Sequence, residues 1–415
     1  MRKFPRIPTW LYGSASLVMS LLILKLNWNL WTISSRHYDR LGADVLPQLN
    51  NIKQRLQTGE GDRMQALFPE GYFFSHAIYG YSWVNVGLAN ESLRQRAIAE
   101  VEWTLEKLDS DKGRRPFQFQ TQVPNGVFYL GWSNRLLGGL LKLQRPAARS
   151  PQNLGRFHVQ SALLAQAYDR RFMLAAYPAM TWPCDQTVAL SSLALHDELF
   201  DSNYRPIIQR WIDHIQQNLD PKTQLIPHKV DADTGVIEIA GRSSSQVYLL
   251  PFLLELDPAF ATQQYQRFRQ QFPVATFGFF PVREYPIGIS GKGDVDTGPL
   301  IFGFSATSTI TSLATAKAFN DRELFDSTLL ITETLGLPLQ VGDQKSYGLG
   351  SLIVIDAFLV WGKTWVPWTK VPQPVINDRP LTIHRGAWLG GSFVGLVLLW
   401  SPLIGRYWRK KRSLS

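Results

Sequence analysis

Residues 126–141, GVFYLGWSNRLLGGLL, and residues 90–108, NESLRQRAIAEVEWTLEKL, show the two kinds of segment that determine the fold. Apolar residues recur at helical spacing along the central part of the chain, and alternating β-branched runs are rare there. The first kind is rich in Gly, Leu and aromatic residues on all faces, which indicates close packing on every side. The second kind is amphipathic, with a charged face expected in water. The sequence therefore predicts an all-α protein with inner and outer helices.

Both kinds of segment recur six times. Amphipathic segments lie at roughly residues 45–58, 94–108, 154–171, 203–219, 258–271 and 320–336. Between them, at intervals of about 50 to 60 residues, the small-residue segments open near Tyr72, Gly126, Cys184, Ser244, Gly298 and Gly348. Six helical hairpins close naturally into a ring, so we expect an (α/α)6 toroid within residues 32–365, with the small-residue helices inside.

Apolar stretches flank this region on both sides. Residues 387–405 contain no charge, and residues 10–24 are apolar up to Lys25. We expect transmembrane helices at residues 10–31 and 386–405. A cleaved signal peptide is the alternative for the first stretch, but no small-x-small cleavage pattern stands near Thr32 to Ser35. Residues 366–385, which contain several prolines, are expected to form an extended linker.

The charge distribution predicts the orientation. The formal net charge is +10, and eight basic residues in the tails account for all but about +2 of it. Basic flanks of spanning helices face the cytoplasm, so the tails at residues 1–9 and 406–415 place both termini inside and the toroid outside, in the periplasm. The basic composition therefore implies a lipid bilayer partner and no nucleic acid. The eight residues are Arg2, Lys3, Arg6, Arg406, Arg409, Lys410, Lys411 and Arg412.

In such a ring the N-terminal ends of the inner helices meet at one mouth, where they carry partial positive charge. The segment AAYPAMTWPCDQ, residues 175–186, and the segment FPVREYPIGISGKGDVDTGP, residues 280–299, bring the most chemistry to this mouth. The candidate substrate-binding residues from all six junctions are Tyr72, His76, Tyr129, Trp132, Trp182, Cys184, Arg242, Gln246, Arg283 and Glu284.

Carboxyl groups beside aromatic rings suit a ring-shaped polar substrate, because the rings stack on it while paired acids move protons. The candidate acids and bases are Asp185, Asp294, Asp296 and Glu70. Each has a structural alternative: Asp185 as a helix cap, Glu70 as a first-turn acid, and the GDVD sequence as a plain loop without the later ligands of a calcium site.

The single cysteine, Cys184, excludes an internal disulfide and is either a nucleophile at a helix N-terminus or a packed thiol. Phosphate-binding loops, dinucleotide fingerprints and zinc motifs are absent from the sequence, so we expect neither a metal nor a cofactor.

The alternation of small-residue and amphipathic helices resembles the six-hairpin toroids of glycosidases and polysaccharide lyases. It is also similar to the toroids of linalool dehydratase/isomerase-like enzymes, which use acids and cysteines among aromatic residues. Residues of the same kinds occur here as Cys184, Asp185, Tyr177 and Trp182. The leading hypothesis is a membrane-held enzyme that acts on a cell-envelope glycan with Asp185 and a second carboxylate as acid and base. An isoprenoid-type dehydratase or isomerase, and a non-catalytic glycan-binding or envelope assembly protein, are the alternatives.

Overall fold

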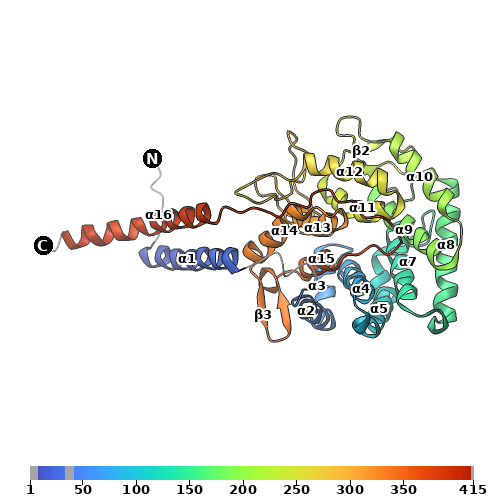
Figure 1. Cartoon of the computed structure of the whole chain (residues 1–415), viewed down its shortest axis with the longest axis horizontal. Coiled ribbons are helices and arrows are strands. Elements are labelled where there is room, and N and C mark those ends of the chain that lie inside the picture. Colours follow the sequence, from blue (N-terminus) through green and yellow to red (C-terminus); the bar gives the residue numbers. More distant parts are fainter. Residues whose placement is uncertain (1–7, 33–41, 413–415) are drawn as a thin grey trace.

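The computed structural model describes residues 8–32 and 42–412, with side chains up to residue 408 (Figure 1). The predicted helical class is confirmed, because sixteen α-helices and only two small sheets occur in this part of the chain. Both sheets are antiparallel pairs: β1 (Lys229–Val230) with β2 (Ile237–Ile239), and β3 (Leu339–Val341) with β4 (Gln344–Ser346).

Six helices correspond to the predicted small-residue segments, and we call them the inner helices. They are α4 (Gly71–Ala89), α7 (Gly126–Leu143), α9 (Pro183–Phe200), α11 (Ser243–Leu256), α13 (Ala306–Ala318) and α15 (Ile353–Thr364). The last two begin several residues later than expected, because Gly298 and Gly348 adopt positive φ angles of 64° and 57° in the preceding loops. Each inner helix contacts the next one along the chain, and α15 contacts α4.

The amphipathic segments form a second set of six helices, the outer helices. They are α2 (Val45–Gln57), α5 (Arg94–Asp109), α8 (Pro151–Arg170), α10 (Arg205–Gln217), α12 (Pro258–Gln271) and α14 (Arg322–Leu335). Each packs mainly against one inner helix, in the pairs α2 with α15, α5 with α4, α8 with α7, α10 with α9, α12 with α11 and α14 with α13. Two further short helices, α3 (Glu60–Leu67) and α6 (Asp111–Arg114), lie beside α4.

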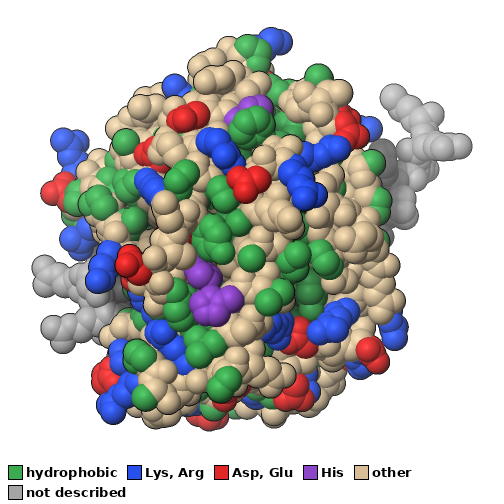
Figure 2. All heavy atoms as spheres, turned by 90° about the vertical axis from the view of Figure 1, so that its right-hand side faces the viewer, with side chains coloured by type: hydrophobic (Ala, Val, Ile, Leu, Met, Phe, Trp, Pro, Cys, Tyr) green, Lys and Arg blue, Asp and Glu red, His purple; other side chains and the backbone are tan. Residues whose placement is uncertain are grey.

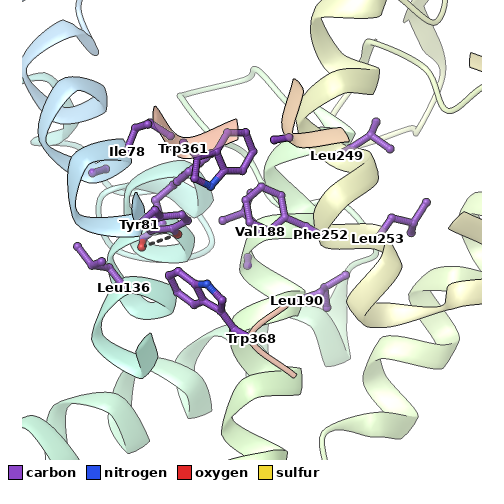
Figure 3. Packing of buried hydrophobic residues seen from close by; sticks show 14 of the residues in the cluster. Ile78, Tyr81, Leu136, Val188, Leu190, Leu249, Phe252, Leu253, Trp361 and Trp368 are labelled. Carbon is purple, nitrogen blue, oxygen red and sulfur yellow. Dashed lines mark hydrogen bonds between the residues drawn. The ribbon is translucent and has the colours of Figure 1, made fainter. Parts of the chain in front are cut away.

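Small residues let the inner helices pack closely, as the sequence indicates. A Cβ atom at Gly131 of α7 would stand 2.9 Å from the Cβ of Ala189 on α9. Large rings fill the space between the helices: Tyr81 of α4, Phe252 of α11 and Trp361 of α15 face one another in the core (Figure 3), and the rings of Phe252 and Trp361 stack at 6.1 Å.

The segment between α15 and α16 contains no helix, but part of it belongs to the core. Trp368 is buried, and its indole N–H donates to Asn85 near the end of α4 at 2.6 Å. Its backbone N–H donates to Glu255, near the end of α11, at 3.0 Å. The segment therefore packs against the C-terminal ends of inner helices (Figure 3).

Two helices at the ends of the described chain, α1 (Thr9–Thr32) and α16 (Arg385–Arg412), are long and apolar enough to cross a membrane. They lie side by side on one side of the domain (Figure 1), and the Asn27 amide donates to the Ser392 hydroxyl at 2.8 Å. Some predictions concern parts of the chain outside the described residues. These parts are the basic residues Arg2, Lys3 and Arg6, residues 33–35 of the possible cleavage region, and the side chains of residues 409–412.

Candidate functional site

Three of the four candidate acids come from separate segments to one place. Glu70 lies at the N-terminal boundary of α4, Asp185 in the first turn of α9, and Asp296 in the loop between α12 and α13. Burial raises the pKa of Asp185 well above its usual range, and the negative charges of Glu70 and Asp296 raise it further. Within residues 8–32 and 42–408, none of the three takes part in an ion pair. Asp185 therefore keeps its proton to a higher pH than an ordinary aspartic acid does.

Asp185 does not cap its helix, because Trp182 occupies the capping position of α9. Asp296 differs from Asp185 in its access to solvent. Partial enclosure raises the pKa of Asp296 to about 6, with added contributions from the charges of Asp294 and Glu70. The residue keeps an exposed side, and water on that side moderates the shift. Folding thus favours the protonated form of Asp185, whereas Asp296 is largely ionised at pH 7.

Two aromatic residues from the loop before α9 border this carboxyl cluster, which we define as Glu70, Asp185 and Asp296. The Tyr177 hydroxyl donates a hydrogen bond to the Glu70 carboxylate. Burial raises the pKa of Tyr177 well above its usual value, so the phenol remains a donor at neutral pH. The Trp182 ring meets the Tyr177 ring edge-on at 6.1 Å, and both side chains are half-buried.

Cys184 lies beside the cluster as a neutral thiol. Burial raises its pKa well above the ordinary value, the charge of Asp185 adds to this, and a hydrogen bond with Ser245 opposes it. A thiol of this kind is a weak nucleophile, since the reactive species is the thiolate. The geometry therefore favours a packing or substrate-contact role for Cys184.

Next to the carboxyl cluster, aromatic rings from three inner helices, α7, α11 and α15, converge on Phe74 of α4. Its ring centroid lies 5.2 Å from that of Phe128, 5.3 Å from Trp132, 6.2 Å from Tyr248 and 5.9 Å from Phe358. Phe74 and Tyr248 are only half-buried although they lie on inner helices, so solvent reaches part of both side chains. We call Phe74, Phe128, Trp132, Tyr248 and Phe358 the aromatic wall. Burial raises the pKa of Tyr248 and the negative charge of Asp296 raises it further, so this wall lies beside the carboxyl cluster.

The fourth candidate acid, Asp294, belongs to a separate network that anchors the α12–α13 loop. Arg242 donates to Glu284 at 2.7 Å and to Asp294 at 2.6 Å. Glu284 is fully buried and also accepts from Ser244 at 2.7 Å and Ser308 at 3.0 Å. Partial burial opposes ionisation of Asp294, but Arg242 lowers its pKa below the usual range. This network fits a positioning role, because its charges are satisfied internally.

Several other candidates point elsewhere. The Nδ1–H group of His76 donates to the Tyr72 carbonyl at 2.8 Å, and the ring packs against Trp103 of α5, on the outer side of α4. Burial lowers the pKa of His76 to about 4. Tyr129 donates to the Leu108 carbonyl of α5 at 3.1 Å.

The remaining four candidates also have identifiable partners. The Tyr72 ring lies 4.2 Å from the His76 ring. The Gln246 amide donates to the Ile226 carbonyl at 2.8 Å. The guanidinium of Arg283 lies beside Gly303 and 6.0 Å from the Phe304 ring. Trp132 lies in the aromatic wall.

Ser245, Tyr248 and Phe74 are the neighbours of the cluster that sequence reasoning did not select. Helical spacing places Ser245 and Tyr248 three residues apart on one face of α11, beside Cys184 and Asp296. That periodicity was the available signal. No comparable signal existed for Phe74, since nearly every side chain of α4 is buried.

A separate cleft lies away from the carboxyl cluster. A cleft of about 320 Å³ lies among α5, α7 and α8, where the Asp109–Arg156 ion pair lines it, so it is separate from the carboxyl cluster. Among the described residues no three His, Cys, Asp or Glu side chains are arranged to hold a metal ion. The chain matches no model of a known protein family.

Proposed function

We propose that the inner and outer helices form an (α/α)6 toroid whose mouth is at the N-terminal ends of the inner helices. The proposal is supported by the contacts of each inner helix with the next, by the return contact of α15 with α4, and by the pairing of each outer helix with one inner helix. The Trp368 segment covers the opposite ends. The mouth is then the open end of the ring, where Glu70, Asp185 and Asp296 lie.

We propose further that the chain is an acid/base enzyme with Asp185 as general acid and Asp296 as general base. The observation that carries this proposal is the gathering of three carboxyl groups from three segments, none of which forms an ion pair with any described residue. A buried carboxyl group beside two further carboxyl groups is unfavourable for folding, and such arrangements occur where an acid must keep its proton at neutral pH. A binding protein has no need of this arrangement.

The aromatic wall favours a largely apolar, hydroxylated isoprenoid-like substrate. A pocket for such a molecule has few polar groups, and here the Glu284 carboxylate is already occupied by Arg242 and Ser244. In a dehydration, Asp185 gives its proton to the hydroxyl group, the C–O bond breaks and water leaves. Asp296 removes a proton from the neighbouring carbon, and a C=C bond forms. The faces of Phe74, Trp132 and Tyr248 stabilise positive charge that develops on carbon.

A cell-envelope glycan is the second candidate substrate. Tyr177 and Trp182 favour it, because they are half-buried aromatic rings at the cluster and sugars stack on such rings. Glycosidic cleavage also needs one protonated and one ionised carboxyl group. In both cases we propose that the site faces the periplasm, because basic tails favour the cytoplasmic side of a membrane.

The test uses the purified full chain in lipid nanodiscs, incubated separately with isoprenoid alcohols and with envelope polysaccharides. Products are identified by mass spectrometry for the wild type, Asp185→Asn, and the exposed control Asp169→Asn. We expect alkene formation that falls by about 100-fold or more in Asp185→Asn and is unchanged in the control. Sugar release with the same dependence would support the glycan instead. Turnover that survives Asp185→Asn would refute the assignment of the acid.

A further inference from the structure

Exposed apolar side chains occur where the helical domain meets α1 and α16. Phe277, in the α12–α13 loop, is 82% exposed, and Leu335 at the end of α14 is 56% exposed. Leu339 and Val341 of β3 are 48% and 68% exposed. We call these four residues the membrane-proximal surface. Large exposed apolar side chains beside apolar terminal helices mark an interaction site.

The first part of this surface touches α16. The indole N–H of Trp388, in the first turn of α16, donates to the Phe277 carbonyl at 2.9 Å. The Trp388 ring lies 6.3 Å from the Phe277 ring and 5.5 Å from the Phe279 ring. Tryptophan at the end of a spanning helix marks the headgroup level of a bilayer. Phe277 therefore lies at that level.

The second part touches α1. Asn29 donates to the Glu333 carbonyl at 2.6 Å, and Lys25 donates to the Pro338 carbonyl at 3.2 Å. Glu333 and Pro338 flank Leu335 and precede Leu339 in the chain. The last turns of α1 thus touch the segment that carries the exposed leucines.

Both helices reach the domain at the same height. The Arg385 guanidinium at the start of α16 lies 5.8 Å from the Trp31 ring near the end of α1. Trp28 and Trp31 are themselves exposed, at 69% and 62%. A level rich in Trp and Arg is typical of the interface between lipid and water.

The backbone at Phe277 gives a second, independent observation. Phe277 and Gly278 have φ angles of 52° and 84° between the bridged residues Thr276 and Phe279. Asn-Gly is the usual pair in such a hairpin turn, because a bulky residue at positive φ is strained. If the Phe277 ring faced water, no burial of apolar surface would offset this strain. Contact with lipid buries the ring and offsets it.

The face of the domain farthest from α1 and α16 has a different character. Figure 2 shows basic and acidic side chains of both signs interspersed with hydrophobic ones on that face. It includes α8, whose Val159 is 60% exposed (Figure 1). Val159 thus provides an exposed apolar reference position on the same domain.

We propose that the membrane-proximal surface lies in the headgroup layer of the bilayer that α1 and α16 cross, and that substrate enters the site from this bilayer. The α12–α13 loop, residues 272–305, carries both Phe277 and Asp296, so one loop connects the lipid surface with the carboxyl cluster. The docking follows from the contacts with α1 and α16, while the entry route rests on the proposed function.

The experiment places a nitroxide label at single cysteines in the full chain, reconstituted in lipid vesicles, in a Cys184→Ser background. The positions are Phe277→Cys, Val341→Cys and the reference Val159→Cys, and the readout is collision with dissolved oxygen and with a water-soluble nickel complex. We expect the labels at 277 and 341 to report high oxygen and low nickel access, at a depth of about 5 to 10 Å, and the label at 159 to report water.

Nickel access at 277 and 341 equal to that at 159 overturns the proposal, as does low access to both reagents, which indicates protein packing instead of lipid. The readout does not depend on turnover. Failure of the Asp185→Asn assay would therefore remove the enzymatic proposal and the entry route, and would leave the docking result unchanged.

Discussion

Replacing Glu255 by glutamine tests whether the segment after α15 is held on the core by a buried ion pair. The Glu255 carboxylate is fully buried and accepts from Arg135 at 2.7 Å, from the Trp368 backbone at 3.0 Å and from the Thr369 hydroxyl at 3.2 Å. The Arg135 guanidinium is 2% exposed and lies 4.4 Å from the Trp368 ring. Glu255→Gln leaves this cation buried without a counter-charge. The expected loss in the free energy of unfolding is about 3 to 5 kcal/mol.

The corresponding shift in Tm follows from the size of the domain. With about 340 residues and about 2.1 cal/mol/K each, the unfolding entropy is roughly 0.7 kcal/mol/K, so Tm should fall by about 4 to 7 °C. The assay is thermal unfolding of the detergent-solubilised full chain, followed by intrinsic fluorescence at one fixed scan rate.

The matched control is Asp169→Asn, which breaks an ion pair with Arg210 whose side chains are 55% and 51% exposed. An exposed pair contributes about 0 to 1 kcal/mol, which corresponds to a shift of roughly 1 °C. A Glu255→Gln variant that melts within this margin of the wild type would show that the buried pair does not hold the segment.

Two further predictions concern the site and the junction before α7. Folding raises the pKa of Asp185, so its carboxyl group contributes stability below its unfolded pKa and loses this contribution as pH rises. The Tm of Asp185→Asn minus that of the wild type should therefore be larger at pH 7.5 than at pH 4. An equal or smaller difference at pH 7.5 contradicts this. Gly126→Ala should cost about 2 kcal/mol or more, because Gly126 has φ of 76° and its Cβ would stand 2.1 Å from the Ala176 carbonyl oxygen. Gly155→Ala, in open space on α8, should stabilise by up to about 1 kcal/mol, and equal Tm changes in the two glycine variants would refute the steric argument.

The positions of the helices follow closely from local sequence. The outer helix expected at residues 258–271 is α12 (Pro258–Gln271), and Asp257 caps it by accepting from the Ala259 and Phe260 amides at 3.0 Å each. Helical periodicity and capping act within a few residues, so a single sequence contains the information. The late start of α13 was not predictable in the same way, since Pro299 and Gly298 delay the helix only in the context of the loop that carries Asp296.

Sequence alone thus determined the helical class, the alternation of buried and amphipathic helices and the two apolar ends, because each depends on residues close together in the chain. Only the tertiary structure decided that Glu70, Asp185 and Asp296 meet while His76 turns outward and Trp368 enters the core. The physical reason is that the inner helices are buried on nearly every side, so no solvent-facing polar face indicates how each is rotated. That rotation is set by packing against neighbours 50 or more residues away, and it selects which side chains reach the site.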